Sequence, residues 1–439
     1  MAGTRYLDPE KAFSRTSRFN GMLLAFLLGF ILCGGFYFLS SFNRQVGWAV
    51  WLIIVWLLFS FSRELPLGRL VRPAGPYLLW LYFFLTWGII VSPITDWAYA
   101  AKVAITTTIL AFCTGILASK PYYLRAFANF AQAGAVVNLV VLIGMAQSTR
   151  FATLVMATVA HNLSYVFGST RYGGMWGNAN MVGCVSVAFL ILSVLATPWI
   201  AWVGRLSCLP LLYYSASRKS AVIFVLLILL YLLIVKRRDF RFWLGLGTLT
   251  FSLALTFMLS AGLRAKSHLA REDANISRVM DIQEKETAQK GDVTRLSLLH
   301  QWLTALTLEP WYGYGMEAMA GTHYDENDPE KIVFKGLFPL GTHNTFLGVW
   351  VETGAAGFIT FVLMIGYYAW KHLSAKGDPV SRWVMVTFLA SNLISLVFMH
   401  TILFCFEGKI LFTLFFMLPD CAGLRDFQRW RDQLRRSSA

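Results

Sequence analysis

The sequence has little charge. Only 14% of its 439 residues are Asp, Glu, Lys or Arg, against about 25% in soluble globular domains. Hydrophobic residues make up 57% of the chain and the mean hydropathy is +0.57. Apolar runs near the ~20 residues needed to cross a bilayer recur along it. The sequence therefore predicts an all-α, polytopic membrane protein, and continuous apolar runs do not fit the alternating pattern of a β-barrel.

The sequence also lacks the usual signs of a metal or disulfide framework. Its six cysteines lie in or beside apolar runs and form no CxxC pair, so neither a zinc site nor disulfides are expected. The acidic run 325–328 lacks the glycine and the spacing of a calcium loop. We expect no metal and no cofactor. A cleavable signal peptide is not expected either, because the first apolar run begins only after Arg18 and is long enough to span.

The net charge of +15 is distributed in a way that argues against nucleic-acid binding. Basic residues cluster in short segments between apolar runs, which is the positive-inside pattern of an inner-membrane protein. Twelve spans with both termini cytoplasmic satisfy all of these segments. The predicted spans are 21–42, 46–62, 76–92, 97–118, 124–147, 181–200, 206–216, 221–235, 243–262, 355–370, 383–404 and 410–424. Glu407 and Lys409 are expected in a short outer turn before the last span.

The spans and loops divide the chain into five parts. The predicted parts are spans one to five (1–147), spans six to nine with polar external motifs (148–262), an external loop (263–342), spans ten to twelve (343–424) and a basic cytoplasmic tail (425–439). The loop carries 12 of the 23 acidic residues but only 9 of the 38 basic ones. A long loop of this kind can cross the membrane regardless of its charge.

An amphipathic helix is expected within the external loop. From Arg295 to Leu306, apolar residues recur at helical spacing (Leu299, Trp302, Leu303, Leu306). Arg295 lies one turn before Leu299, on or beside this apolar face. The helix is expected to lie on the membrane surface or over the bundle, and a loop helix packed only on its own neighbours is the alternative.

Two residues on the external side are candidates for chemistry. His343 stands where a helix is about to begin, and its near-neutral pKa suits a general base; a capping role is the alternative. Arg218 lies in a turn between two spans, where it could snorkel toward lipid phosphates or hold an anionic group of a lipid substrate. Lys219 adds a second positive charge beside it.

Four motifs, in this order and topology, resemble the bacterial O-antigen ligase and polysaccharide polymerase superfamily. They are the run from Arg171 to Asn180, Ser217-Arg218-Lys-Ser-Ala221, Arg295 leading to Pro310-Trp-Tyr-Gly-Tyr-Gly315, and His343-Asn344-Thr-Phe-Leu347 with Glu352-Thr-Gly354-Ala-Ala-Gly357. The resemblance covers about 171–370. This chain departs from the family at Ala179, where the family often has proline, and at Lys219, where it has a small residue.

The resemblance implies an inverting, metal-independent glycosyltransferase on the periplasmic face of the inner membrane. Its donor would be a glycan on undecaprenyl diphosphate and its acceptor a sugar hydroxyl, that of lipid A-core for a ligase. His343 would be the base, and Arg218 and Arg295 would stabilise the departing diphosphate. Arg171, Asn180, Lys219 and Asn344 would support substrate binding.

Other functions remain open from the residues alone. A polymerase would pass the glycan to a growing chain, and a protein O-oligosaccharyltransferase would pass it to a protein. A transporter of the lipid-linked glycan would also suit twelve spans. Transporters tend to carry ionisable groups and broken helices at mid-bilayer, whereas the predicted span interiors are nearly free of charge. An intramembrane protease would need a Ser/His or paired-Asp arrangement within spans, and the sequence shows none.

Overall fold

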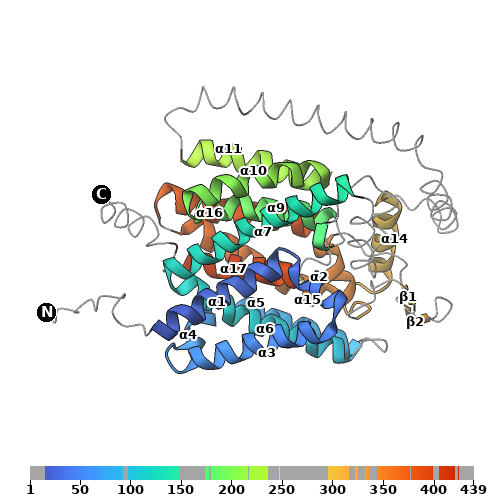
Figure 1. The fold of residues 1–439 in the computed structure, drawn as a ribbon. Coiled ribbons are helices and arrows are strands. Elements are labelled where there is room, and N and C mark those ends of the chain that lie inside the picture. Colours follow the sequence, from blue (N-terminus) through green and yellow to red (C-terminus); the bar gives the residue numbers. More distant parts are fainter. Residues whose placement is uncertain are drawn as a thin grey trace.

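The protein is a bundle of helices (Figure 1). The computed structural model describes residues 15–91, 97–148, 174–176, 179–215, 217–235, 247, 295–315, 322–324, 332–335, 344–375, 377–398, 405–420 and 424. The α-helices are α1 (Arg15–Leu32), α2 (Gly35–Phe42), α3 (Arg44–Ser62), α4 (Leu67–Val71), α5 (Gly75–Val91), α6 (Trp97–Ser119), α7 (Pro121–Gln147), α9 (Ala179–Leu192), α10 (Pro198–Ser215), α11 (Arg218–Ile234), α14 (Arg295–Leu308), α15 (Thr345–Ser374), α16 (Pro379–Phe398) and α17 (Phe406–Met417). Short 3-10 helices are η1 (Arg72–Ala74), η3 (Gly174–Trp176) and η6 (Leu418–Asp420), and β1 (Thr322–Tyr324) pairs antiparallel with β2 (Ile332–Lys335).

The helical membrane class is confirmed. Within the described residues, six helices are long and apolar enough to cross a bilayer. They are Gln45–Ser62, Leu67–Val91, Ala100–Ser119, Pro121–Met145, Thr345–Ser374 and Pro379–Val397. Shorter apolar helices cover Arg18–Leu32, Asn180–Leu192 and Lys219–Ile234. The count of twelve spans and the cytoplasmic termini stay predictions, and the expected span 243–262 and the basic tail lie outside the described residues apart from Gly247.

Three predicted spans were wrong in their bounds, for local reasons. The first span is interrupted at Gly34, whose φ of +84° places it in the left-handed region that favours glycine, so α1 and α2 are separate helices. The sixth span ends early at Leu192 and the seventh begins early at Pro198, a residue suited to a helix start because it needs no N–H partner. Arg205 consequently lies within α10 rather than in a loop, where its Nε donates to Ser193 Oγ at 2.7 Å.

The outer turn expected at Glu407 and Lys409 is helix instead. Both residues belong to the first turn of α17, and their exposed fractions are 1% and 2%. The sequence predicts an outer turn here, where these two charged residues interrupt the apolar runs. Neighbouring helices enclose this turn, since α17 packs on α6, α1 and α16.

Small residues let the central helices approach closely. A Cβ on Gly29 of α1 would lie 2.7 Å from the Phe130 Cβ of α7, and one on Gly134 of α7 would overlap Cys33. Within a membrane, where lipid is as apolar as leucine, close packing of this kind is what holds helices together. α1 and α7 therefore form the centre against which α9, α10 and α17 assemble.

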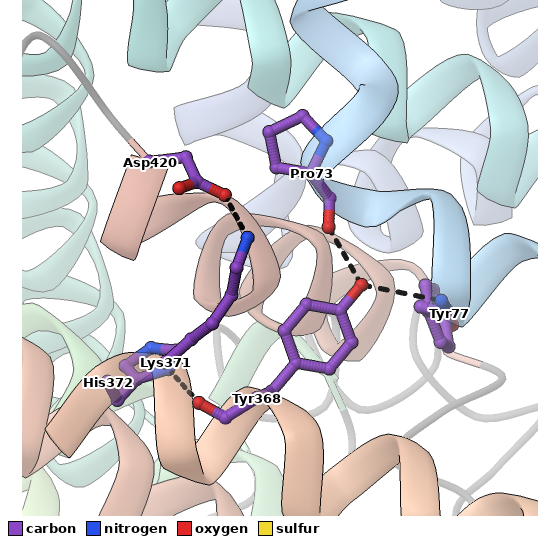
Figure 2. Close-up of polar contacts among 6 residues, drawn as sticks. All are labelled: Pro73, Tyr77, Tyr368, Lys371, His372 and Asp420. Atoms are coloured by element: carbon purple, nitrogen blue, oxygen red, sulfur yellow. Dashed lines mark hydrogen bonds and ion pairs between the residues drawn. The ribbon is translucent and has the colours of Figure 1, made fainter. Parts of the chain in front are cut away.

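The two ends of the bundle differ. At one end, α14 and the strands lie together (right in Figure 1), whereas α4 lies at the opposite end. Near α4, the Tyr368 hydroxyl donates to Pro73 O at 2.8 Å and accepts from Tyr77 N at 3.4 Å. Figure 2 shows this cluster, with Lys371 paired to Asp420 and His372 Nδ1 at 2.8 Å from Tyr368 O. These bonds tie α15 to η1, α5 and η6 at the end away from α14.

Candidate active site

Helix α15 is broken and folds back on itself. Gly354 has φ +64° and ψ −166° inside the helix. In a straight helix the 15 residues from Phe346 to Phe361 would cover about 22 Å, yet the two ring centroids are 5.4 Å apart. Trp350 likewise stacks on Phe358 at 4.6 Å. Residues 345–353 therefore run back along the helix that starts at Ala355, which places the start of α15 against the bundle.

The turn at 310–315 completes the hydrogen bonding of this break. A helix end leaves carbonyl and N–H groups without partners, and the break in α15 creates one end of each kind. Backbone groups of the turn bond to both kinds. The bonds are Tyr314 N to Val351 O (2.8 Å), Gly315 N to Glu352 O (2.9 Å) and Ala355 N to Pro310 O (2.9 Å). The turn and the break therefore form one unit.

Two glycines make the close approach possible. A Cβ on Gly354 would lie 2.6 Å from Tyr312 N, and one on Gly313 would lie 2.5 Å from Gly354 N. Gly313 also has a positive φ of +73°. No other residue type can occupy these positions without separating the turn from the helix. The Pro310–Gly315 turn and the Glu352–Gly357 segment, noted separately in the sequence, thus meet in space.

Helix α14 docks on the returning part of α15. Trp302 is fully buried and Leu306 nearly so, in a small core with Val351. The Tyr314 hydroxyl donates to Ala305 O at 3.0 Å, and burial raises the pKa of this phenol, with a smaller contribution from Glu309. The amphipathic helix is confirmed, but Leu303, expected on the apolar face, is 51% exposed.

Asn344 begins the returning segment. Its side-chain oxygen accepts from Leu347 N at 3.1 Å, which is an N-cap of α15. The next residue, Thr345, is fully buried. His343, one residue earlier, lies outside the described residues. Asn344, the residue that follows His343, is thus held at the start of a helix that packs against the bundle.

The starts of α9 and α11 are in direct contact. A Cβ on Gly183 of α9 would lie 2.8 Å from Ser217 Cβ, which precedes α11. Asn180 lies one turn before Gly183 and is half-buried. The structure therefore brings the motif that ends at Asn180 against the motif that begins at Ser217.

Helix α11 begins with features that suit an anion. Lys219 is 8% exposed, and its Nζ has no hydrogen-bond partner among the described residues. Ser217 provides no side-chain cap to the helix, since its Oγ accepts from Ser220 Oγ at 2.9 Å instead. The uncapped N–H groups of a helix start and its positive dipole end attract negative charge. Arg218 is the first residue of this helix.

The seven residues predicted for the site fall in three groups. The structure describes the side chains of Asn180, Lys219 and Asn344. It describes only the backbone of Arg218 and Arg295, which are the first residues of α11 and α14. The remaining two, Arg171 and His343, lie outside the described residues. Contacts join α9 with α11 and α14 with α15. The convergence of all seven side chains stays a prediction. In the part of the chain that the structure describes, no group of three or more His, Cys, Asp or Glu could hold a metal ion.

Together these features define a helical membrane protein whose helices form a bundle (Figure 1). Basic residues begin α11 and α14, and the 310–315 turn docks on α15. Residues 204–362, which include α11, α14 and the break in α15, match the family described as O-Antigen ligase. A comparison with curated proteins found no match. The family match confirms the resemblance to the O-antigen ligase superfamily and indicates a membrane glycosyltransferase-type enzyme that uses a lipid-linked glycan and an acceptor.

Proposed function

We propose that this protein is an inverting, metal-independent glycosyltransferase of the O-antigen ligase type. It moves a glycan from undecaprenyl diphosphate to a hydroxyl group of lipid A-core on the periplasmic face of the inner membrane. His343 acts as the base, and Arg218 and Arg295 bind the diphosphate. Arg171, Asn180, Lys219 and Asn344 support the substrates.

The observation that carries the proposal is the unit formed by α14, the 310–315 turn and the break in α15. It begins with Arg295 at the start of α14 and reaches Asn344, the residue after His343. Backbone bonds at 2.8–2.9 Å fix the turn to both halves of α15. A base and a cation attached to one rigid unit can be held in a fixed relation, which is what transition-state stabilisation requires.

The start of α11 supports the choice of a diphosphate donor. An ammonium group buried without a partner is costly unless a ligand supplies the opposite charge, and among the residues that the structure describes Lys219 has no partner. Arg218 beside it can bind phosphate oxygens with two parallel hydrogen bonds. An anionic group bound here would be stabilised by both residues and by the helix dipole.

The chemistry follows from these roles. The acceptor hydroxyl attacks the anomeric carbon from the side opposite the diphosphate, and a new carbon–oxygen bond forms as the bond to the phosphate oxygen breaks. His343 takes the hydroxyl proton, and the bonding electrons leave with undecaprenyl diphosphate. Arg218 and Arg295 stabilise the negative charge that develops on the leaving oxygen.

Single substitutions test these roles in transfer assays with purified protein and lipid-linked glycan. His343→Ala should lower the rate by about 10²–10⁴, the usual contribution of a positioned base. Arg218→Ala and Arg295→Ala should each lower it by about 10²–10³. Arg69→Ala, an exposed charge in α4 at the opposite end, serves as the control and should leave the rate unchanged. Near-normal transfer by His343→Ala would remove the base assignment.

The acceptor distinguishes the related alternatives. A polymerase would extend the glycan when lipid A-core is absent, and a protein O-oligosaccharyltransferase would modify a protein acceptor. We favour the ligase because the family model that matches residues 204–362 is described as O-Antigen ligase. Transfer reactions with and without lipid A-core separate the ligase from the polymerase.

A transporter of the lipid-linked glycan is the second candidate, and specific observations favour it. Broken helices and buried ionisable groups are typical of transporters. The structure contains both: the break in α15, and buried Lys219, Glu407 and Lys409. The absence of charge from span interiors, expected from the sequence, therefore no longer argues against transport. Chemical analysis of the glycan's attachment decides between the two, because a transporter changes only its side of the membrane.

A further inference from the structure

The 310–315 turn presents large apolar side chains at the surface. Trp311 is 69% exposed and Tyr312 is 61% exposed. Leu308, at the end of α14 just before the turn, is exposed as well. Single exposed apolar residues are normal in any protein, but a cluster of them marks contact with a partner or a membrane. The turn is fixed to α15 by backbone bonds, so these rings are held in place.

Helix α5 binds the turn near its own end. Trp87 Nε1 donates to Tyr312 O at 3.0 Å, and the two rings are stacked with their centroids 6.4 Å apart. Helix α5 ends at Val91, so Trp87 lies about 6 Å before the end of the helix at 1.5 Å per residue. The turn therefore lies beside the last turn of α5, and not beyond it.

Helix α15 adds a second indole to the turn. Trp350 Nε1 donates to Pro310 O at 3.2 Å, and its ring stacks on Phe358 with centroids 4.6 Å apart. Helices α5 and α15 pack against each other. Two carbonyl groups of the turn, those of Pro310 and Tyr312, thus accept from tryptophans of neighbouring helices. Irregular backbone is tolerated near a bilayer only where protein bonds of this kind satisfy it.

The surface of α5 shows how far the bilayer reaches. This helix belongs to the candidate membrane span Leu67–Val91. Ile90, which lies nearer the helix end than Trp87, is 71% exposed, and Leu79 is exposed further down the same helix. Exposed apolar side chains of a spanning helix are the ones that lipid covers. Lipid along α5 therefore extends at least to the level of Trp87, where the turn is attached.

The two exposed residue types suit the edge of a bilayer. Tryptophan and tyrosine are enriched where hydrocarbon meets the headgroups, because their rings are apolar and carry one polar group. Helix α14, which leads into the turn, lies at one end of the bundle (right in Figure 1). The turn is thus attached at an end of a spanning helix, where the headgroups lie, and its exposed surface continues the lipid-facing surface of α5.

We propose that Trp311 and Tyr312 insert into the headgroup region of the bilayer and anchor the 310–315 turn to phospholipids beside the end of α5. The anchor goes beyond the proposed function, since it needs neither a glycan nor a transfer reaction. Because the turn is bonded to both sides of the break in α15, the anchor holds α14 and the start of α15 at the depth of the lipid phosphates.

The test measures lipid contact in the full-length protein, in nanodiscs that hold one copy and no lipid-linked glycan. A fluorescent amino acid replaces Trp311 in one sample and Thr304 in the matched control. Thr304 is exposed on α14, on the side away from the buried Trp302. Phospholipids with bromine on the acyl chains near the headgroups should quench most of the emission at 311 and little at 304. Iodide in the buffer should do the reverse.

Two results of this experiment would overturn the proposal. If iodide quenches the probe at 311 as strongly as the probe at 304 and the brominated lipids do not, position 311 lies in water. If neither quencher reaches the probe at 311, another segment of the chain covers it, since each nanodisc holds only one copy. Strong quenching by the brominated lipids at 311 alone identifies phospholipid as the partner.

Substitutions test whether the lipid contact holds the turn. Trp311→Asp replaces the ring by a charge, whereas Trp311→Phe keeps an aromatic ring, and neither removes a backbone bond of the turn. Limited proteolysis in nanodiscs should cleave the Asp variant near residues 310–315 and leave the Phe variant as resistant as the wild type. Equal resistance of both variants would show that protein contacts alone hold the turn, and the anchor would be refuted. The quenching experiment decides independently if the Asp variant does not fold.

Discussion

Replacing Gly354 by alanine should undo the unit formed by α14, the turn and α15. The residue has φ +64° and ψ −166°, a region that is essentially restricted to glycine, so the backbone strain alone is about 1–3 kcal/mol. The new Cβ would also lie 2.6 Å from Tyr312 N. Relief of this contact separates the turn from α15 and breaks the three backbone bonds between them, each of which contributes about 0.5–1.5 kcal/mol. The docked state should thus lose about 3–7 kcal/mol.

Two assays report this loss. Limited proteolysis of the protein in nanodiscs should show new cleavage near residues 310–315, and transfer from lipid-linked glycan should fall at least 10²-fold because Arg295 and His343 are no longer held together. Gly366→Ala in the same helix is the matched control. A Cβ there meets nothing within 4 Å, and alanine is the better helix former, so both assays should match the wild type.

The result that would refute the reasoning is specific. If Gly354→Ala resists proteolysis and transfers glycan like Gly366→Ala, the break in α15 does not position the catalytic residues. Loss of transfer in both variants would show that the helix as a whole, and not its break, is required.

Two further substitutions test separate parts of the site. Trp302→Ala empties the small core that holds α14 on α15 and should lower the free energy of docking by about 3–5 kcal/mol, measured as new proteolysis within α14. The control is Leu303→Ala at an exposed position of the same helix. Equal protection of the two variants from proteolysis would contradict the packing. Lys219→Met removes a buried charge that has no partner among the described residues, so the unfolding temperature should stay the same or rise. KM for the lipid-linked donor should rise about tenfold, and an unchanged KM would show that Lys219 does not contact the donor.

The helical membrane bundle could be predicted from sequence because its signal is local. A run of apolar residues near bilayer length specifies a helix by itself, and helices such as α3 and α5 lie within two residues of the expected spans. The amphipathic pattern after Arg295 likewise specified α14, since spacing at three and four residues defines a face.

The break in α15 could not be predicted because it depends on a distant segment. The residues around Gly354 are compatible with a continuous helix, and the bonds from the 310–315 turn, which is distant in sequence, stabilise the break. Both motifs are visible in the sequence, but their contact depends on tertiary structure. Their glycines at 313 and 354 were the available signal, since a positive φ is their common property.

The burial of Glu407 was missed for a similar reason. A charged pair beside an apolar run indicates a loop on local grounds, and only the packing of α17 against α6 and α1 shows that the pair is inside. The sequence shows Lys219 as a second cation, but that its ammonium group is buried with no partner among the described residues follows from tertiary structure alone. The burial of these charged groups is where the structure adds most to the functional account.

The central claim is that the protein transfers a glycan from a lipid diphosphate to lipid A-core. The measurement that tests it most directly is product analysis of a reaction that contains only purified protein, glycan on undecaprenyl diphosphate and lipid A-core. The account predicts that lipid A-core gains the glycan and that free undecaprenyl diphosphate is released in equal amount. When lipid A-core is omitted, the glycan should not be extended. Recovery of the lipid-linked glycan unchanged, with an intact bond to its diphosphate, would contradict it.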